Sequence, residues 1–173
     1  MINPRAPVNA RTFGANMMGV RGFNALQIIL ASGFPSLTEL GHVPAHVERL
    51  ASLPEPVSLV RADESVNFKL AANTSDPIRS DTAIYPGIVQ AIPGAVTAPD
   101  YFLTGSKPRT FQLIKRVAPP EKHPSLVFIR LPIKFVSSST SKSGTPELWL
   151  TTVVLHSDDS VMPYLKKGIS VGV

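Results

Sequence analysis

The chain has 173 residues, which is enough for one domain, or for one domain with an arm. Hydrophobic residues make up 43% and charged residues 17%, less charge than the roughly 25% usual in soluble proteins, so we expect part of the surface to be buried in a homo-oligomer. The absence of cysteine excludes disulfide frameworks and thiolate metal sites. The longest apolar run, Phe23–Phe34, falls short of the ~20 residues of a membrane span, and the N-terminus lacks the layout of a signal peptide. We therefore expect a soluble protein made inside the cell, without membrane contact.

A proline-rich junction, LPEP, divides residues 1–53 from residues 54–173. We expect the first part to be an N-terminal arm or extension with short helices. Ser36 and Glu39 have the spacing of a capping box, which predicts a helix start. Pro44 is placed to open a second helix, because apolar residues recur after it at helical spacing.

Beyond this junction the hydrophobic period changes to two. The segment VSLVRADESVNFKLA predicts a β-hairpin that turns at residues 61–64. A turn-rich stretch follows over residues 73–81. Further strands are predicted in three places, Thr82–Tyr85, Gly87–Ile92 and Tyr101–Thr104.

The most informative window lies between Lys107 and Lys134, where seven basic residues and one acidic residue give a local charge of +6. The whole chain is only +5, so the rest of the chain sums to −1. The window contains two predicted strands, 109–117 and 126–136, and a cationic sheet face is typical of polyanion binding. If these strands are antiparallel neighbours, alternation places one set of side chains on the same surface: Gln112, Arg116, Phe128, Arg130 and Lys134. Cationic groups contact phosphates and an aromatic ring stacks on a base, so we predict an RNA-binding face there.

The opposite side of the second basic strand is an unbroken apolar row from Val127 to Phe135, which predicts core packing. Lys115 falls on the apolar side of the first strand, so we expect either a bulge or a side chain that reaches solvent at the strand end.

The C-terminal part leaves two structures open. Thr145 and Pro146 resemble a helix start, whereas the following LWLTTVVL is rich in β-branched residues and suits a buried strand. We favour helix–turn–helix over a final strand. The last segment, SDDSVMPYLKKG, predicts a short helix, with acids early, lysines late and a glycine at its end.

Catalytic and metal motifs are missing from the sequence. His42 and His46 are four residues apart, but Pro44 lies between them and no further ligand follows at the spacing of a zinc site. Asp158 and Asp159 suit a helix N-terminus better than acid–base chemistry. There is no nucleophile elbow, P-loop or dinucleotide fingerprint. We therefore predict neither an enzyme nor a cofactor or metal site.

The order of these features resembles the coat proteins of the small single-stranded RNA phages, the levivirus type, over about residues 55–173. The likeness lies in the hairpin VSLVRADESVNFKLA, the middle strands, the basic strands RTFQLIKRVAPP and SLVFIRLPIKFV, and the C-terminal PELWLTTVVLHSDDSVMPYLKKG. It implies an α+β fold: an antiparallel β-sheet preceded by a β-hairpin, with two C-terminal helices packing on one sheet face and across a dimer. An all-β jelly-roll capsid is the alternative if LWLTTVVL is a strand.

The resemblance also implies a function. Dimers would assemble into an icosahedral shell whose inner sheet face binds the genomic RNA through Gln112, Arg116, Phe128, Arg130 and Lys134. The protein would then be found in the virion, after synthesis in the host cytoplasm. The alternative function is a non-capsid β module that binds single-stranded nucleic acid.

Overall fold

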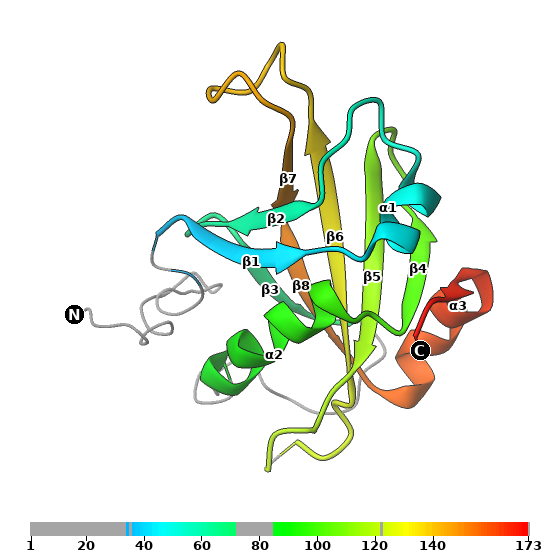
Figure 1. The fold of residues 1–173 in the computed structure, drawn as a ribbon. Coiled ribbons are helices and arrows are strands. Elements are labelled where there is room, and N and C mark those ends of the chain that lie inside the picture. Colours follow the sequence, from blue (N-terminus) through cyan, green and yellow to red (C-terminus); the bar gives the residue numbers. More distant parts are fainter. Residues whose placement is uncertain (1–33, 35, 72–84, 122, 173) are drawn as a thin grey trace.

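A computed structural model describes residues 34, 36–71, 85–121 and 123–172. Its elements follow the chain in this order: β1 (Thr38–His42), α1 (Ala45–Ala51), β2 (Leu59–Ala62), β3 (Asn67–Leu70), α2 (Tyr85–Thr97), β4 (Tyr101–Thr104), β5 (Thr110–Arg116), β6 (Phe128–Val136), β7 (Glu147–Leu150), β8 (Thr152–His156), α3 (Asp158–Lys167) and β9 (Ile169–Ser170). The fold is α+β (Figure 1). No helix in the described ranges has both the length and the apolar character needed to cross a membrane.

The strands of the described residues form one mixed sheet, most of whose ladders are antiparallel. Its main path runs β1-β2-β7-β6-β5-β4-β9, and β3 continues beside β8, which pairs with β6. The parallel ladders are those of β2 with β7 and of β3 with β8. The two basic strands, β5 and β6, are antiparallel neighbours over seven residue pairs, which is the arrangement that the predicted common surface requires.

β7 and β8 lie along the same side of β6 and are separated by a bulge at Thr151. Ile133 pairs with Leu150, yet Arg130 pairs with Val154, so β7–β8 has one more residue than β6 over this stretch. The break lies opposite Pro132, which has no N–H to give to a ladder. The Thr151 amide nitrogen donates instead to the Pro132 carbonyl oxygen, at 3.1 Å.

The main core lies on one face of this sheet. Four side chains of β6 that were predicted as an apolar row lie within it: Ile129, Leu131, Ile133 and Phe135. Val127, the first residue of that row, packs instead in a second cluster beneath α3. In the main core the row meets Val47 of α1 and one side of α2, namely Ile88, Ile92, Ala95 and Val96. Figure 1 shows β1 crossing in front of β8 before the chain continues to α1.

Close packing between β1 and α2 depends on Gly41. Its φ is +122°, and a Cβ at this position would lie 2.7 Å from Thr97 Cγ2. The register of β1 on β2 also shifts here, between Glu39 and Gly41. The predicted helix start at Ser36 and Glu39 is therefore wrong, because these residues lead into β1. The helix expected after Pro44 is confirmed as α1.

The predicted hairpin is also wrong. Its two strands exist as β2 and β3, but they do not pair with each other. Each lies parallel to a strand that comes more than 80 residues later, with Val60 beside Leu148 and Phe68 beside Val153. Asp63 closes the intervening turn, since its side chain accepts hydrogen bonds from the amide and the hydroxyl of Ser65.

The structure corrects two further element assignments. LWLTTVVL forms the end of β7 and most of β8, so one C-terminal helix, α3, stands where a pair was expected. The predicted strand Gly87–Ile92 is part of α2, while Tyr101–Thr104 is confirmed as β4. The all-β alternative is wrong as well, because three helices pack on the sheet within the described residues.

Part of the predicted N-terminal extension and middle region lies outside the described residues: 1–33, 35 and 72–84, and with them most of Phe23–Phe34 and Thr82–Tyr85. The described remainder of 1–53 supplies β1 and α1, which pack in the same core as the later strands.

The final helix, α3, begins as the sequence indicates. Ser157 is its N-cap, and Ser157 and Ser160 form a reciprocal capping box. Asp158 and Asp159 occupy the first turn, while Lys166 and Lys167 occupy the last, which suits the helix dipole. Val161 of this helix packs on Leu103, Ile114 and Phe128, on the sheet face opposite the main core. The helix thus covers one end of the face that was predicted to bind RNA.

Candidate nucleic-acid interface

The sheet face opposite the main core carries five basic residues, and we call it the cationic face: Arg61, Lys69, Arg116, Arg130 and Lys134. Residues that are paired across a ladder point to the same side of a sheet. Arg61 pairs with Trp149, which pairs with Lys134, and Lys69 pairs with Val154, which pairs with Arg130. Arg116 pairs with Phe128, beside His156 on the next strand. The ladders therefore bring cations from four strands onto one surface.

All five residues predicted for the RNA-binding face lie on this surface. Gln112 stands opposite Pro132, Arg116 opposite Phe128, and Lys134 opposite Thr110, as alternation on antiparallel neighbours requires. Lys115 lies on the apolar side of β5, as alternation predicts, since it pairs with Ile129 without a bulge. Its side chain reaches out of the core and donates from Nζ to the Ala98 carbonyl oxygen at 2.8 Å. Placement on the face is confirmed, whereas contact with RNA stays a prediction.

Phe128 is not placed to stack on a base. Its side chain is only 4% exposed and belongs to the cluster beneath α3. The guanidinium carbon of Arg116 lies 4.4 Å from the ring centroid of Phe128. Arg116 also donates from Nη2 to Asp158 of α3 at 3.1 Å. These two residues therefore attach α3 to the sheet, and the stacking role predicted for Phe128 is wrong.

Trp149 is the aromatic residue that lies open on the cationic face. Its indole is half-buried and stands between Arg61 and Lys134 in the ladder. Its Nε1–H donates to Glu147 Oε1 at 2.9 Å, and Ser143 donates to the other oxygen of this carboxylate. These two hydrogen bonds lower the pKa of Glu147, and Arg61 adds a smaller contribution. The anchored indole presents its ring beside a cavity of about 420 Å³ that Lys134 also lines.

Because of the bulge at Thr151, the Trp149 side chain points to the same side of the sheet as Val154 and Arg130. Trp149 and Val154 are an odd number of residues apart, so a regular strand would point them to opposite faces. The extra residue of the bulge offsets this odd spacing, so both side chains point to the same face of the sheet. The indole thus lies on the same side as Arg130, next to a larger cavity of about 580 Å³ that shares Thr152 with the first.

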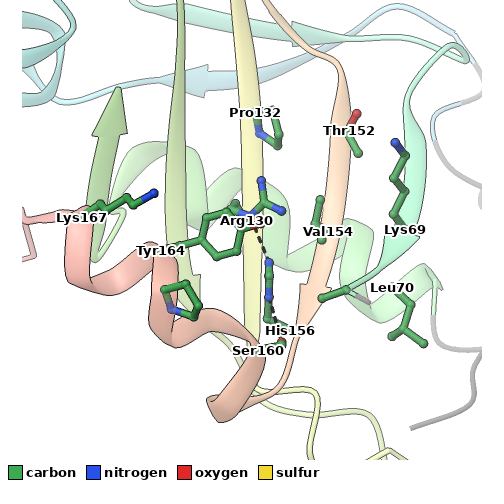
Figure 2. Close-up of a pocket in the computed structure, with 12 residues that line it drawn as sticks. Lys69, Leu70, Arg130, Pro132, Thr152, Val154, His156, Ser160, Tyr164 and Lys167 are labelled. Carbon is green, nitrogen blue, oxygen red and sulfur yellow. Dashed lines mark hydrogen bonds between the residues drawn. The ribbon is translucent and has the colours of Figure 1, made fainter. Parts of the chain in front are cut away.

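Arg130 occupies the floor of the larger cavity. It donates from Nη1 to Gln112 Oε1 at 2.5 Å and from Nε to His156 Nε2 at 3.0 Å. Its guanidinium carbon lies 4.0 Å from the ring centroid of Tyr164 on α3. Figure 2 shows the guanidinium between Tyr164 and Val154, with the dashed bond to His156 below it.

His156 holds Arg130 in place as a neutral acceptor. Arginine only donates, so the Nε2 atom that receives its bond carries no proton. The Nδ1–H then donates to Ser160 Oγ at 2.9 Å. Burial lowers the pKa of His156 to about 4, and the positive charge of Arg130 acts in the same direction. The imidazole is therefore neutral at physiological pH.

Sequence reasoning missed Arg61, Lys69, Trp149, Tyr164 and Lys167, since their elements were assigned incorrectly or placed on the other face. The alternation of Leu148, Trp149 and Leu150 was the signal for a strand, because it sets one half-buried aromatic between two buried leucines. The described residues contain no cluster of three or more potential metal ligands. Comparison with known proteins gave no match to a family model, a curated protein or a solved structure.

Proposed function

We propose that this protein binds single-stranded RNA on the cationic face. The observation that carries the proposal is the set of cations without a counter-charge: among the described residues, Lys69, Arg130, Lys134 and Lys167 form no ion pair with a carboxylate. Arg61 and Arg116 are compensated by Glu147 and Asp158. Uncompensated cations on one surface release counterions when they meet phosphates.

The indole of Trp149 favours an unpaired strand as the ligand. Bases of single-stranded RNA are free to stack on aromatic side chains, whereas those of a duplex are stacked on each other. The groove that contains Trp149 lies between the Asp63–Ser65 turn and Lys134, which sets an aromatic surface beside a cation. This combination supports binding of a base and its neighbouring phosphate.

Trp149 is the only tryptophan of the chain, so its fluorescence reports on this groove alone. We expect a short oligouridylate to quench the emission, because a stacked base provides a route for quenching. Trp149→Ala is expected to weaken binding by about 1–3 kcal/mol, the usual contribution of one stacked base. Trp149→Phe keeps a ring and is expected to retain most of the affinity. RNA binding that leaves the fluorescence unchanged would place the interface elsewhere.

A substitution of Lys134 tests whether the cationic face contacts RNA phosphates. Lys134→Ser is expected to make the dependence of log affinity on log salt concentration less steep by about 0.7, as for one lost phosphate contact on a single strand. Lys142→Ser removes an exposed lysine in the 137–146 loop and is the matched control. Equal slopes for the two variants would exclude Lys134 from the interface.

The wider form of the proposal is a coat protein that assembles into a shell around its RNA. Support comes from the low charge content and from the exposed Ile169 on β9, the last strand on the sheet path, which suits self-association. Two of the features on which the resemblance to levivirus coat proteins rested, the hairpin and the helix pair, are not found in the described residues. The two basic strands and the final helix are present. Electron microscopy of purified protein, with the 260/280 nm absorbance ratio of the same sample, tests it. Uniform shells with a high ratio are expected; small particles free of nucleic acid would refute the shell.

A further inference from the structure

The cavity of about 580 Å³ lies between α3 and the strands β3, β8 and β6. Three basic residues line it, Lys69 from β3, Arg130 from β6 and Lys167 from the last turn of α3, and its lining among the described residues includes no carboxylate. In Figure 2 the Lys167 side chain points toward Tyr164 and Arg130 from one side, and Lys69 stands beyond Val154 on the other. The cavity is therefore a site of concentrated positive charge.

Arg130 is the central feature of this site because no carboxylate in the described part of the chain pairs with it. The groups that hold it are neutral: an amide oxygen, an imidazole nitrogen and a phenol ring. Burial lowers the pKa of the guanidinium, which means that the charged form has lost favourable hydration. An arginine stays ionised in proteins, so a half-buried one without an anion retains a desolvation cost that a bound anion would offset.

The shape of the guanidinium defines the class of anion. Two of its five N–H donors are used by Gln112 and His156, which fixes the plane of the group. Arginine binds the oxygens of phosphates and carboxylates through paired N–H donors, and the two lysines add point charges. Thr152, whose side-chain hydroxyl is a hydrogen-bond donor, also lines the cavity.

We propose that this cavity is a phosphate-binding site, in which Arg130 contacts the phosphate oxygens and Lys69 and Lys167 neutralise its charge. The proposal rests on the proposed function in taking RNA as the source of the phosphate. Two positions in RNA offer this chemistry, an internal phosphodiester and a terminal 5′-phosphate. The shared Thr152 connects the site to the Trp149 groove, so one strand can occupy both.

The first test compares matched variants of the full chain. Lys69→Gln/Lys167→Gln removes the two exposed cations of the site and leaves the core intact, whereas Lys142→Gln/Lys166→Gln removes two exposed lysines that do not line it. Binding of a 3′-labelled oligouridylate is measured by anisotropy, with a 5′-phosphate or a 5′-hydroxyl. We expect the cavity pair to weaken binding roughly tenfold more than the control pair.

The two oligonucleotides identify the source of the phosphate. A preference for the 5′-phosphate that disappears in the cavity pair supports a terminal phosphate. Equal affinity for both, with the loss in the cavity pair retained, supports an internal phosphodiester. Equal behaviour of the cavity and control pairs overturns the phosphate site, while the quenching of Trp149 still decides the proposed function.

The second test does not depend on RNA. The Arg130 Nε–H group, hydrogen-bonded to His156, gives a resolvable ¹⁵N–¹H signal in arginine-labelled protein, and Arg130→Lys identifies it. Titration with inorganic phosphate is expected to shift this signal saturably in the wild type and in the control pair, and much less in the cavity pair. No shift overturns the site. A shift in a protein that binds neither oligonucleotide supports the site and refutes the proposed function.

Discussion

Ile129→Asp is expected to prevent folding. Ile129 is fully buried near the start of β6, on the face opposite Arg130, and packs in the main core. Loss of the buried isoleucine side chain alone costs about 2–5 kcal/mol, and a carboxyl group without a partner adds the cost of burying a polar group. The sum is comparable to the whole stability of an ordinary domain, about 5–15 kcal/mol.

Circular dichroism and the soluble fraction after expression measure the effect. Lys134→Asp is the matched control, since it puts the same carboxylate on an exposed position of the same strand, and it is expected to fold. Ile129→Val, which removes one methyl group, should lower the free energy of unfolding by only about 0.5–1.5 kcal/mol. Soluble, folded Ile129→Asp protein would show that the two faces of β6 are inverted.

Acid is expected to destabilise the protein through His156. The pKa of this group falls from 6.5 to about 4 on folding. Between these pH values the unfolded chain therefore binds a proton on His156 that the folded protein does not bind. The associated stability is complete above about pH 6.5 and is lost as the pH falls toward 4. A shift of this size corresponds to about 3 kcal/mol, because one pKa unit contributes ~1.4 kcal/mol.

Burial of the imidazole is the main cause of the lowered pKa, and the charge of Arg130 adds to it. A protonated Nε2 would face the Arg130 Nε–H at 3.0 Å, with Tyr164 and Ser160 as the other neighbours of the imidazole ring. Urea unfolding at a series of pH values between 5.5 and 7 measures the effect, because most carboxylates are ionised throughout this range. His156→Gln keeps an acceptor for Arg130 and has no titrating group, so its stability should change less over this range. Parallel curves for the two proteins would contradict the assignment.

The part of the interface formed by β5 and β6 was predictable from the alternation of polar and apolar residues in these strands. β5 and β6 alternate regularly, so the common side of Gln112, Arg130 and Lys134 followed from the sequence once the two strands were taken as antiparallel neighbours. The burial of Phe128 did not follow, because it depends on where α3 docks after the strands are in place. Alternation gives the direction of a side chain, and only packing decides whether solvent reaches it.

The segment that forms α2 shows a different failure. Its glycines and prolines disfavour a helix and its β-branched residues favour a strand, yet Pro93 lies within the helix. The buried residues Ile88, Ile92, Ala95 and Val96 nevertheless follow the helical period. In this segment the burial of one helical side outweighs weak propensity, as tertiary context commonly does.

The sequence by itself determined the cationic window, the two basic strands with their faces, the helix after Pro44 and the capped final helix. Each of these depends on interactions within a few residues or between adjacent strands. The tertiary structure alone decided that β2 and β3 lie parallel to β7 and β8, because ladders between distant segments have no local signal. Those ladders and the bulge at Thr151 bring Lys69, Trp149 and Arg130 onto one face, and the docking of α3 adds Tyr164 and Lys167.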